Sequence, residues 1–463
     1  MNNADGLRPE YHAVAEWIEQ VGPQVLMERR GEAEALFRRV GITFAVYGEG
    51  GDPDRLIPFD IVPRVFSARE WARIEQGSIQ RTKALNAFLT DIYTEGAILK
   101  DGIVPEAEVR NNKAYAPIME GMRPPGGIFS HVTGVDLVRC GQDEFYVLED
   151  NCRTPSGISY VLENREVMLR MFPQLFADGL IRPVDTYADM LATAMEEVAP
   201  PHCDRDPRLA ILTPGHFNSA YYEHSFLADQ MGIDLVEGQD LFVEDGRLWM
   251  RTIRGPSRVD VLYRRIDDAF LDPKAFRPDS MLGVPGLMEI YKQGGVTIVN
   301  APGAGVADDK SIYIHVPEMI RYYLGEEAIL PNVPTYRCAD PDQCAHVLAN
   351  IGDLVVKEVH GSGGYGMIIG PAATDAECAA YAKRIEADPA GFIAQPTLKL
   401  STAPTLSESG LVERHVDLRP YVISGKRTRL IPGGLTRVAL REGSLVVNSS
   451  QGGGVKDTWV LSR

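Results

Sequence analysis

The segment GVDLVRCGQDEFYVLEDNCRTPSG, residues 134–157, is the most informative part of this sequence. Residues 135–139 and 144–148 are short runs rich in β-forming side chains, and a turn with a glycine at 141–142 separates them. This pattern is typical of a β-hairpin, in which side chains on adjacent strands lie side by side. We therefore expect an antiparallel pair of strands over this segment.

The predicted hairpin places three oxygen-bearing side chains together. It brings Asp136 beside Glu149, and Asn151 projects from the same face as Glu149 because the two residues are two positions apart. Carboxylate and amide oxygens are the ligands that Mg²⁺ prefers, commonly shared with nucleotide phosphates. The pattern predicts a metal site, and the alternative is a solvated acidic hairpin.

A glycine-rich loop follows a lysine much later in the chain. Residues 353–370, DLVVKEVHGSGGYGMIIG, read as a strand that carries Lys357, a loop, and a second strand. Glycines allow the backbone to approach phosphates closely, and a lysine adds a positive charge. The arrangement is neither a P-loop nor a dinucleotide fingerprint, because both require a helix after the loop. The alternative is an ordinary glycine-rich hairpin. The candidate cradle residues are Gly361, Ser362, Gly363, Gly364 and Gly366.

These two elements together resemble the ATP-grasp fold, but in reversed order, since the lysine and loop normally precede the metal cluster. Joining the chain ends restores the usual order. With PFDIVPR at 58–64, LEDNCRTPSGISYVLENR at 148–165 and DLRPYVISGKRTRLIPGGLTRVAL at 417–440, the sequence resembles the circularly permuted ATP-grasp type 2 family from about residue 41 to 461. More distantly, it is similar to glutathionylspermidine synthase.

The resemblance implies an α/β (α+β) fold, a circularly permuted ATP-grasp fold with an inserted, Rossmann-like pre-ATP-grasp domain. We expect the metal-bearing half at 1–200, the α/β domain at 201–334, and the half with the lysine and glycine loop at 335–463. A Pro-rich, charged stretch at 199–208 marks the first boundary. Short apolar strands at 209–213, 259–263 and 296–299 favour a parallel sheet. Helices are expected at 12–21, 31–39 and 68–93.

The resemblance also implies ATP and Mg²⁺ as cofactors, with Asp136, Glu149 and Asn151 as the metal ligands. Lys357 would contact phosphate. Lys310, in VADDKSIY at the start of a helix, takes the place of the second nucleotide-binding lysine, and Gln395, after the strand GFIA, lies where the hinge meets adenine. A solvated lysine and a surface glutamine are the alternatives.

The expected anion-binding catalytic residues are mainly arginines, whose forked donors suit phosphate and acyl-phosphate oxygens. They occur in DLRPY, GGLTRVAL and NCRTPSG, with an asparagine in VVNSSQ. The alternative for each arginine is a solvated or structurally paired side chain. These residues are Arg419, Arg437, Arg153 and Asn448.

Substrate residues are expected at strand ends of the α/β domain, where open parallel sheets bind ligands. Arg264 and Arg265 follow one strand and would bind a substrate carboxylate, unless they form a surface pair with Asp267 and Asp268. His216 and Asn218 follow another strand, although a lone histidine is more often structural. His360, beside the glycine loop, is similarly open to both interpretations.

Composition is that of a globular enzyme, with 44% hydrophobic and 24% charged residues. The net charge of −17 argues against a nucleic-acid partner. The first twenty residues carry acidic side chains and no apolar core, and no stretch is apolar enough for a membrane helix, so we expect a cytoplasmic protein without membrane contact. Six cysteines without a CxxC pair indicate reduced thiols rather than a zinc site. The sequence identifies no protein partner.

The sequence favours an ADP-forming, Mg²⁺-dependent carboxylate–amine ligase that makes a peptide-type amide through an acyl-phosphate. Its partners would be a small-molecule or peptide carboxylate and an amine acceptor. The alternatives are a non-catalytic ATP-binding regulatory or scaffold protein and an ATP-grasp phosphotransferase, which would share the nucleotide site and differ in the acceptor pocket.

Overall fold

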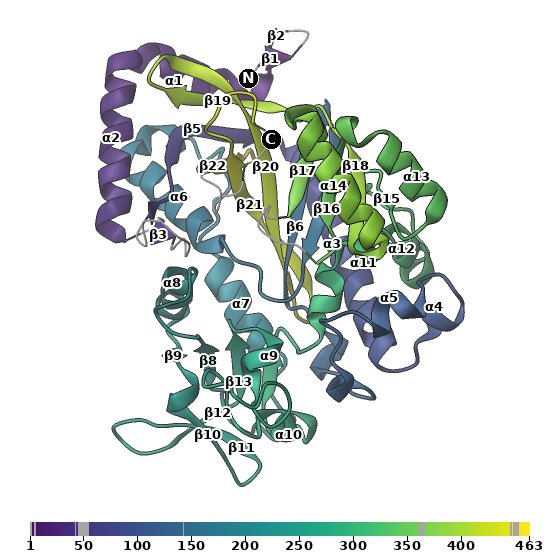
Figure 1. The fold of residues 1–463 in the computed structure, drawn as a ribbon. Coiled ribbons are helices and arrows are strands. Elements are labelled where there is room, and N and C mark those ends of the chain that lie inside the picture. Colours follow the sequence, from purple (N-terminus) through teal and green to yellow (C-terminus); the bar gives the residue numbers. More distant parts are fainter. Residues whose placement is uncertain are drawn as a thin grey trace.

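The computed structural model describes residues 2–3, 6–41, 43–44, 55–141, 143–360, 366–444, 447 and 453–463. The protein has a mixed α/β fold, in which a large central sheet is accompanied by a parallel α/β unit and a smaller antiparallel sheet (Figure 1). The expected α/β class is confirmed.

The central sheet joins the beginning and the end of the chain. Within the described ranges it has seven strands in the order β5-β22-β21-β20-β6-β7, with β19 paired to β20. The first and last of these strands in sequence, β5 and β22, run parallel, with Phe66 opposite Val460. This pairing places the beginning and the end of the chain side by side in one sheet, which fits a permuted chain. The strands are β5 (Phe59–Phe66), β6 (Val132–Gly141), β7 (Glu144–Asn151), β19 (Thr402–Ser407), β20 (Gly410–Ser424), β21 (Thr428–Val438) and β22 (Gly454–Val460).

Helix α3 (Ala68–Tyr93) is the longest helix that packs on this sheet. It begins at a capping box between Ser67 and Glu70, a device that contributes about 1 kcal/mol. Its buried face includes Trp71 and Phe88, each of which stabilises the fold by about 1.5–3 kcal/mol through removal from water. The bounds predicted for this helix and for α1 (His12–Val21) are confirmed, whereas α2 (Pro23–Val40) begins earlier than expected at a proline. Helix α6 (Ile158–Met171) packs against β21 and β22.

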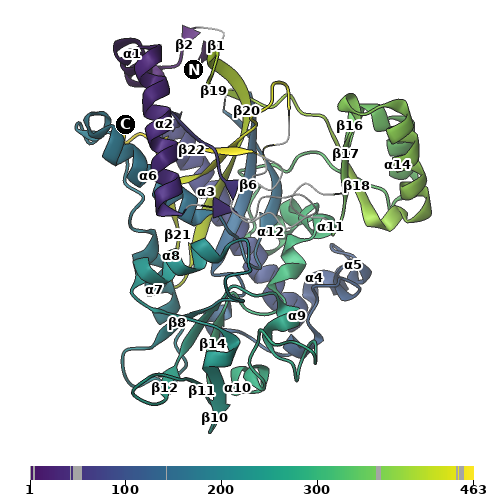
Figure 2. The same cartoon turned by 60° about the vertical axis from the view of Figure 1, so that its left-hand side comes forward.

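The parallel α/β unit lies below the central sheet in Figures 1 and 2. Its strand order is β14-β13-β8-β9, and all neighbours run parallel, as predicted. The stretch at 199–208 before it contains neither helix nor strand. A small antiparallel extension, β10-β11-β12, is attached. The strands are β8 (Leu209–Leu212), β9 (Asp234–Val236), β10 (Leu241–Glu244), β11 (Arg247–Met250), β12 (Ser257–Val259), β13 (Val261–Arg264) and β14 (Thr297–Val299).

The smaller sheet has the order β15-β18-β16-β17 and stands beside the central sheet in Figure 2. Strand β16 carries Lys357 and pairs antiparallel with β17, so the predicted strand–loop–strand unit is confirmed. Its strands are β15 (Tyr336–Arg337), β16 (Leu354–Glu358), β17 (Met367–Ile369) and β18 (Phe392–Pro396). The helices on it are α13 (Pro341–Ala349) and α14 (Asp375–Ala387).

Other helices connect these parts. They are α4 (Ala97–Lys100), α5 (Glu106–Arg110), α7 (Tyr187–Glu196), α8 (Tyr221–Met231), α9 (Asp268–Leu271), α10 (Leu287–Lys292), α11 (Lys310–Tyr313) and α12 (Val316–Leu324). Searched over the described residues, no helix is long and apolar enough to cross a membrane.

The division at 200 and 334 remains a proposal. Strand pairing adds one fact to it, because strands β19 to β22 lie in the same sheet as strands from the first region, while β15 to β18 form the smaller sheet.

Candidate nucleotide and metal site

The register of the β6–β7 hairpin places Asp136 directly opposite Glu149, as predicted. Gly134 lies opposite Asn151 in the same ladder. Between the two candidate ligands, Asp150 lies in the buried interior and accepts two hydrogen bonds from Arg81, at 2.6 and 2.7 Å. Strand alternation therefore gives β7 one structural carboxylate and one carboxylate available for other contacts.

Two arginines hold Asp136. Arg419 donates to both of its carboxylate oxygens, with the Nη2 to Oδ2 distance at 2.7 Å, and Arg437 donates from Nη2 at 2.7 Å. Burial alone would raise the pKa of Asp136, but these two guanidinium groups together hold the pKa well below its ordinary value. Asp136 is therefore a permanent anion at neutral pH.

Glu149 is the more available carboxylate. Its side chain is 30% exposed, and its ion-pair contacts are long, at 3.8 Å to Nζ of Lys310 and 3.7 Å to Nη2 of Arg419. Lys310 is the first residue of α11, and the helix is capped by Asp309, which accepts from the backbone N–H of Ser311. The predicted helix start at Lys310 is confirmed.

Lys357 belongs to the same electrostatic cluster although it comes from the smaller sheet. Burial is the main cause that lowers the pKa of Lys357 to about 8, and nearby Lys310 adds to this effect, while Glu149 and Asp136 oppose it. Its Nζ donates to Oε1 of Gln395 at 2.7 Å. Gln395 lies inside β18 rather than after the strand, which corrects the expected strand end.

The glycine loop is only partly described. Gly361, Ser362, Gly363 and Gly364 lie outside the described residues, as does Asn448. Gly366 adopts a positive φ of 69°, and its carbonyl accepts from the hydroxyl of Tyr381 at 2.5 Å. Nδ1 of His360 forms a hydrogen bond with Oδ2 of Asp309 at 2.7 Å, which connects the residue before the glycine loop to the residue that caps α11.

Asp417 is a residue of the candidate site that sequence reasoning missed. Arg437 donates from Nε to its two carboxylate oxygens at 2.9 and 3.0 Å, so Arg437 bridges Asp417 and Asp136. Burial raises the pKa of Asp417, against the opposing effect of Arg437. The sequence position of Asp417 could have indicated it, because Asp417 is two residues before Arg419 and so shares a strand face with it.

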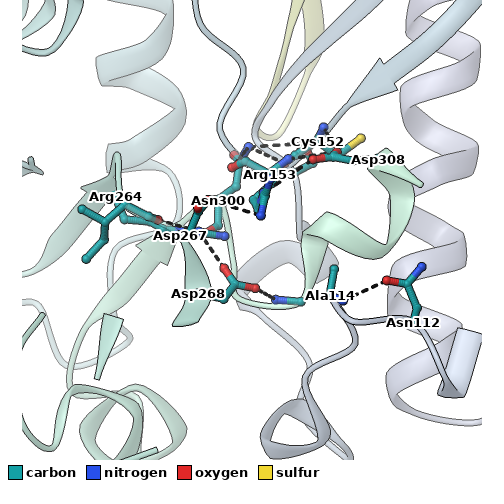
Figure 3. Close-up of polar contacts among 12 residues, drawn as sticks. Asn112, Ala114, Cys152, Arg153, Arg264, Asp267, Asp268, Asn300 and Asp308 are labelled. Atoms are coloured by element: carbon teal, nitrogen blue, oxygen red, sulfur yellow. Dashed lines mark hydrogen bonds and ion pairs between the residues drawn. The ribbon is translucent and has the colours of Figure 1, made fainter. Parts of the chain in front are cut away.

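Figure 3 shows the surroundings of Arg153, just beyond β7. This guanidinium pairs with Asp267 at 3.2 Å and with Asp308 at 3.8 Å and is 39% exposed. Asp308 accepts from the backbone N–H groups of Cys152 and Arg153, and burial raises its pKa to about 7. Arg153 and its two carboxylate partners therefore lie between the β6–β7 hairpin and the end of the parallel sheet.

Arg264 and Arg265 are both buried, so they are not the surface pair that was the alternative for them, although Arg264 does contact Asp268. Arg264 donates to the carbonyl oxygens of residues 266, 300 and 301 and pairs with Asp268 at 2.6 Å. Arg265 donates to Glu223 at 2.9 Å and to the carbonyl oxygen of Pro155 at 2.8 Å. Their role in binding a substrate carboxylate stays a prediction, and these contacts occupy most of the donors that such a role requires.

His216 and Asn218 lie after β8, as expected, and have local contacts. The ring of His216 lies 4.0 Å from that of Phe217, centroid to centroid, and both side chains are exposed. Asn218 accepts from the backbone N–H of Ala220 at 2.9 Å. A substrate role for either residue stays a prediction.

The chemistry of the donor set fits Mg²⁺. The hairpin offers two carboxylates and one amide, and no cluster of three or more His, Cys, Asp or Glu side chains suited to a metal occurs among the described residues. A cation here would complete its shell with phosphate oxygens and water, the usual habit of Mg²⁺. The Nδ2 atom of Asn151 is buried without a partner, so this amide can rotate to present its oxygen without losing a hydrogen bond at Nδ2.

Comparisons with known proteins agree with this geometry. The circularly permuted ATP-grasp type 2 family matches residues 63–439. An uncharacterised protein of Synechocystis is 53% identical, over 98% of this chain and 94% of its own. A Frankia alni protein whose name proposes a glutamate–cysteine ligase is 45% identical over 99% of this chain, but the match covers 53% of that protein.

A solved structure shares the fold. The glutathione synthetase-like effector of Globodera pallida, in its apo form, aligns with a TM-score of 0.58, over 95% of this chain and 98% of its own. At 12% sequence identity, this likeness bears on the fold alone.

Proposed function

Because this chain belongs to the circularly permuted ATP-grasp type 2 family, we propose that it is an ATP-dependent carboxylate–amine ligase that uses Mg²⁺. The observation that carries the proposal is the pairing of Asp136 with Glu149 beside Lys310, with Lys357 in the same electrostatic cluster. These groups come from three distant parts of the chain. Such convergence of two carboxylates and two lysines suits a nucleotide with its metal ion.

In the proposed reaction, the γ-phosphoryl group of ATP passes to a substrate carboxylate and leaves ADP. An amine then attacks the acyl-phosphate, an amide forms, and inorganic phosphate departs with the proton lost from the amine. Bound Mg²⁺ would neutralise charge on the β and γ phosphates. The chain's own contribution is positioning and charge stabilisation, so no covalent enzyme intermediate is required.

Individual residues take definite parts in this proposal. Asp136 and Glu149, with Asn151, would hold the metal ion. Lys357, with its pKa at about 8, is mostly protonated at pH 7 and can donate to phosphate. Arg419 and Arg437 keep Asp136 ionised and place guanidinium charge next to the transferred group.

The substrates remain to be found. The Frankia protein named for glutamate–cysteine ligation supports amino acids as a first choice, but this chain spans about half of its length, so its named activity describes the longer protein. Glutamate with cysteine is therefore one pair to test among others.

The test is a screen of carboxylate and amine pairs with MgATP, in which ADP, phosphate and new amides are measured by coupled assay and mass spectrometry. The Glu149→Gln variant is the negative control, and Glu244→Gln, an exposed residue of β10, is the matched control. Equal amounts of ADP and amide with the wild type support the ligase. A phosphorylated product without amide would identify a phosphotransferase, and ATP binding without turnover over the whole screen would favour a regulatory protein.

A further inference from the structure

A pocket outside the candidate site opens beside the segment that leads from β18 of the smaller sheet to β19 of the central sheet. Its volume is about 730 Å³, and it is lined by the ends of β5 and β6, the segment 399–403 and part of β20. That volume lies in the range of roughly 300–1,000 Å³ typical of small-molecule sites. Its described lining includes none of the candidate nucleotide or metal residues named above. The basic residues of this described lining are Arg8, Arg64, Arg139, Lys399 and His415.

Arg64 is the unusual residue of this pocket. It is only 4% exposed, yet it forms no ion pair with any carboxylate of the described residues. Its Nη1 donates to the carbonyl oxygen of Asp417 at 2.8 Å, and the guanidinium carbon lies 4.8 Å from the centre of the Phe66 ring. Burial lowers the pKa of Arg64 to about 10, so the side chain remains charged at neutral pH. A buried charge without a counter-ion is costly, which indicates a missing anion.

Asp417 and Glu70 raise the pKa of Arg64 through their negative charge, but neither carboxylate forms an ion pair with it. Glu70 is shared by Arg8 at 2.6 Å and Arg139 at 2.5 Å, and Glu10 also pairs with Arg8. The pocket lining therefore has three guanidinium groups, and the two carboxylates that pair with Arg8 and Arg139 are not part of that lining.

The rest of the pocket lining also favours an anion. The Nδ1 atom of His415 is buried without a hydrogen-bond partner. At the rim, Lys399, Glu413 and Glu442 are all exposed to water. Screening by water weakens these rim charges, so the deeper wall determines the sign of the field inside. The interior is positive in a chain whose net charge is −17.

We propose that this pocket binds the oxyanion group, carboxylate or phosphate, of a small molecule, with Arg64 as the principal ligand. The guanidinium fork would bind two oxygens of the anion, and Arg139 and His415 would add donors. The remaining volume would hold the body of the molecule. No residue of its described lining belongs to the proposed nucleotide cluster, although Arg64 and Arg437 both contact Asp417. The inference does not depend on whether the chain is a ligase.

Calorimetry and thermal unfolding test this with two probes, sodium phosphate and sodium glutarate, against sodium chloride at equal ionic strength. We expect at least one probe to bind the wild type and raise its Tm above the chloride control. A preference for phosphate or for glutarate identifies the class of ligand. If neither probe binds, the proposal is wrong.

The Arg64→Gln variant should weaken probe binding by about 10- to 100-fold, the value of a charged hydrogen bond of about 1.5–3 kcal/mol. Arg277→Gln, an exposed arginine paired with Asp279, is the matched control and should bind the probe as the wild type does. Unchanged binding in Arg64→Gln would overturn the proposal.

Two further arms keep the result decisive. If Arg64→Gln does not fold, His415→Gln, at a partly exposed position, replaces it and should weaken binding several-fold. Unchanged binding in His415→Gln would contradict the proposal. Repeating the titration with saturating MgADP should leave probe binding measurable, because the described lining of the pocket contains none of the candidate nucleotide residues. Complete loss of probe binding would place the anion in the nucleotide site instead.

Discussion

Arginines at two places in the molecule show what sequence position leaves undetermined. Arg419 and Arg437 in the central sheet contact Asp136, next to the partly exposed Glu149. Arg264 and Arg265 at the end of β13 instead donate to backbone carbonyl oxygens, and they pair with the partly buried Asp268 and the buried Glu223. All four occupy positions suited to anion binding. The two pairs of arginines differ in the partners to which their N–H groups already donate, and not in their position in the strand.

The largest expected effect is on stability, at Arg264. The Arg264→Ala variant should lower the free energy of unfolding by about 3–5 kcal/mol, because Asp268 loses its buried partner. Urea unfolding measures this, and Arg277→Ala, an exposed arginine, is expected to stay within about 0.5 kcal/mol of the wild type. A loss below about 1 kcal/mol at Arg264 would mean that this residue is not structural.

The next effect is on turnover, at Glu149. The Glu149→Gln variant keeps the volume but removes the anionic metal ligand, and kcat should fall by about 10²- to 10³-fold, the typical result of losing one charge-stabilising group. Its free energy of unfolding should stay within about 1 kcal/mol of the wild type, because Glu149 has only long ion-pair contacts.

The adjacent Asp150→Asn variant reverses this pattern. It breaks the buried pair with Arg81, so stability should fall while the metal-binding face is kept. Steady-state kinetics with unfolding curves for both variants make the comparison. Equal losses of stability in the two variants would contradict the assignment of the two faces of β7.

Lys357 predicts a pH dependence. Its pKa in the folded protein, about 8, lies below its ordinary value of 10.5. The charged form binds phosphate, so MgADP affinity should be full below pH 8 and decline as pH rises through about 8. Between pH 8 and 10.5 the unfolded chain holds a proton that the folded chain lacks, so this residue makes the free energy of unfolding increase with pH.

The Lys357→Met variant is the control for this titration. MgADP affinity can be measured by calorimetry over about three pH units around the expected transition, from about pH 6.5 to 9.5. In the variant this affinity should not change with pH. An identical slope in wild type and variant would assign the pH dependence to another group.

The smallest expected effect is on stability at Arg153. This side chain is 39% exposed, and its pairs with Asp267 and Asp308 are at 3.2 and 3.8 Å. The Arg153→Gln variant should therefore change the free energy of unfolding by less than about 1 kcal/mol. A raised KM with an unchanged Tm would support a substrate contact. A stability loss as large as that of Arg264→Ala would instead show that Arg153 is a structural residue.

Local pattern predicted the parts of the site that depend on neighbouring residues. Alternation within residues 134–157 fixed the hairpin and the opposition of Asp136 and Glu149, and apolar periodicity fixed α3. Side-chain contacts between distant segments could not be predicted from a local sequence pattern. Glu223 reaches Arg265 from α8, and Asp308 reaches the backbone after β7, contacts that depend on how whole elements pack.

The same limit applies to Arg64. Its sequence context, PFDIVPR, indicates a strand but not a buried guanidinium without a carboxylate partner among the described residues. That property arises only when β5 pairs with β22 and packs beside β20. Burial and charge pairing are thus the features that require a structure.

The most direct test of the central claim is Mn²⁺ binding, measured by electron paramagnetic resonance with and without ADP. If Asp136, Glu149 and Asn151 share a metal ion with nucleotide phosphates, ADP should tighten Mn²⁺ binding by about tenfold or more, because phosphate oxygens complete the shell. Glu149→Gln should lose this gain. Mn²⁺ affinity that is the same with and without ADP, or a gain fully retained in Glu149→Gln, would contradict the account.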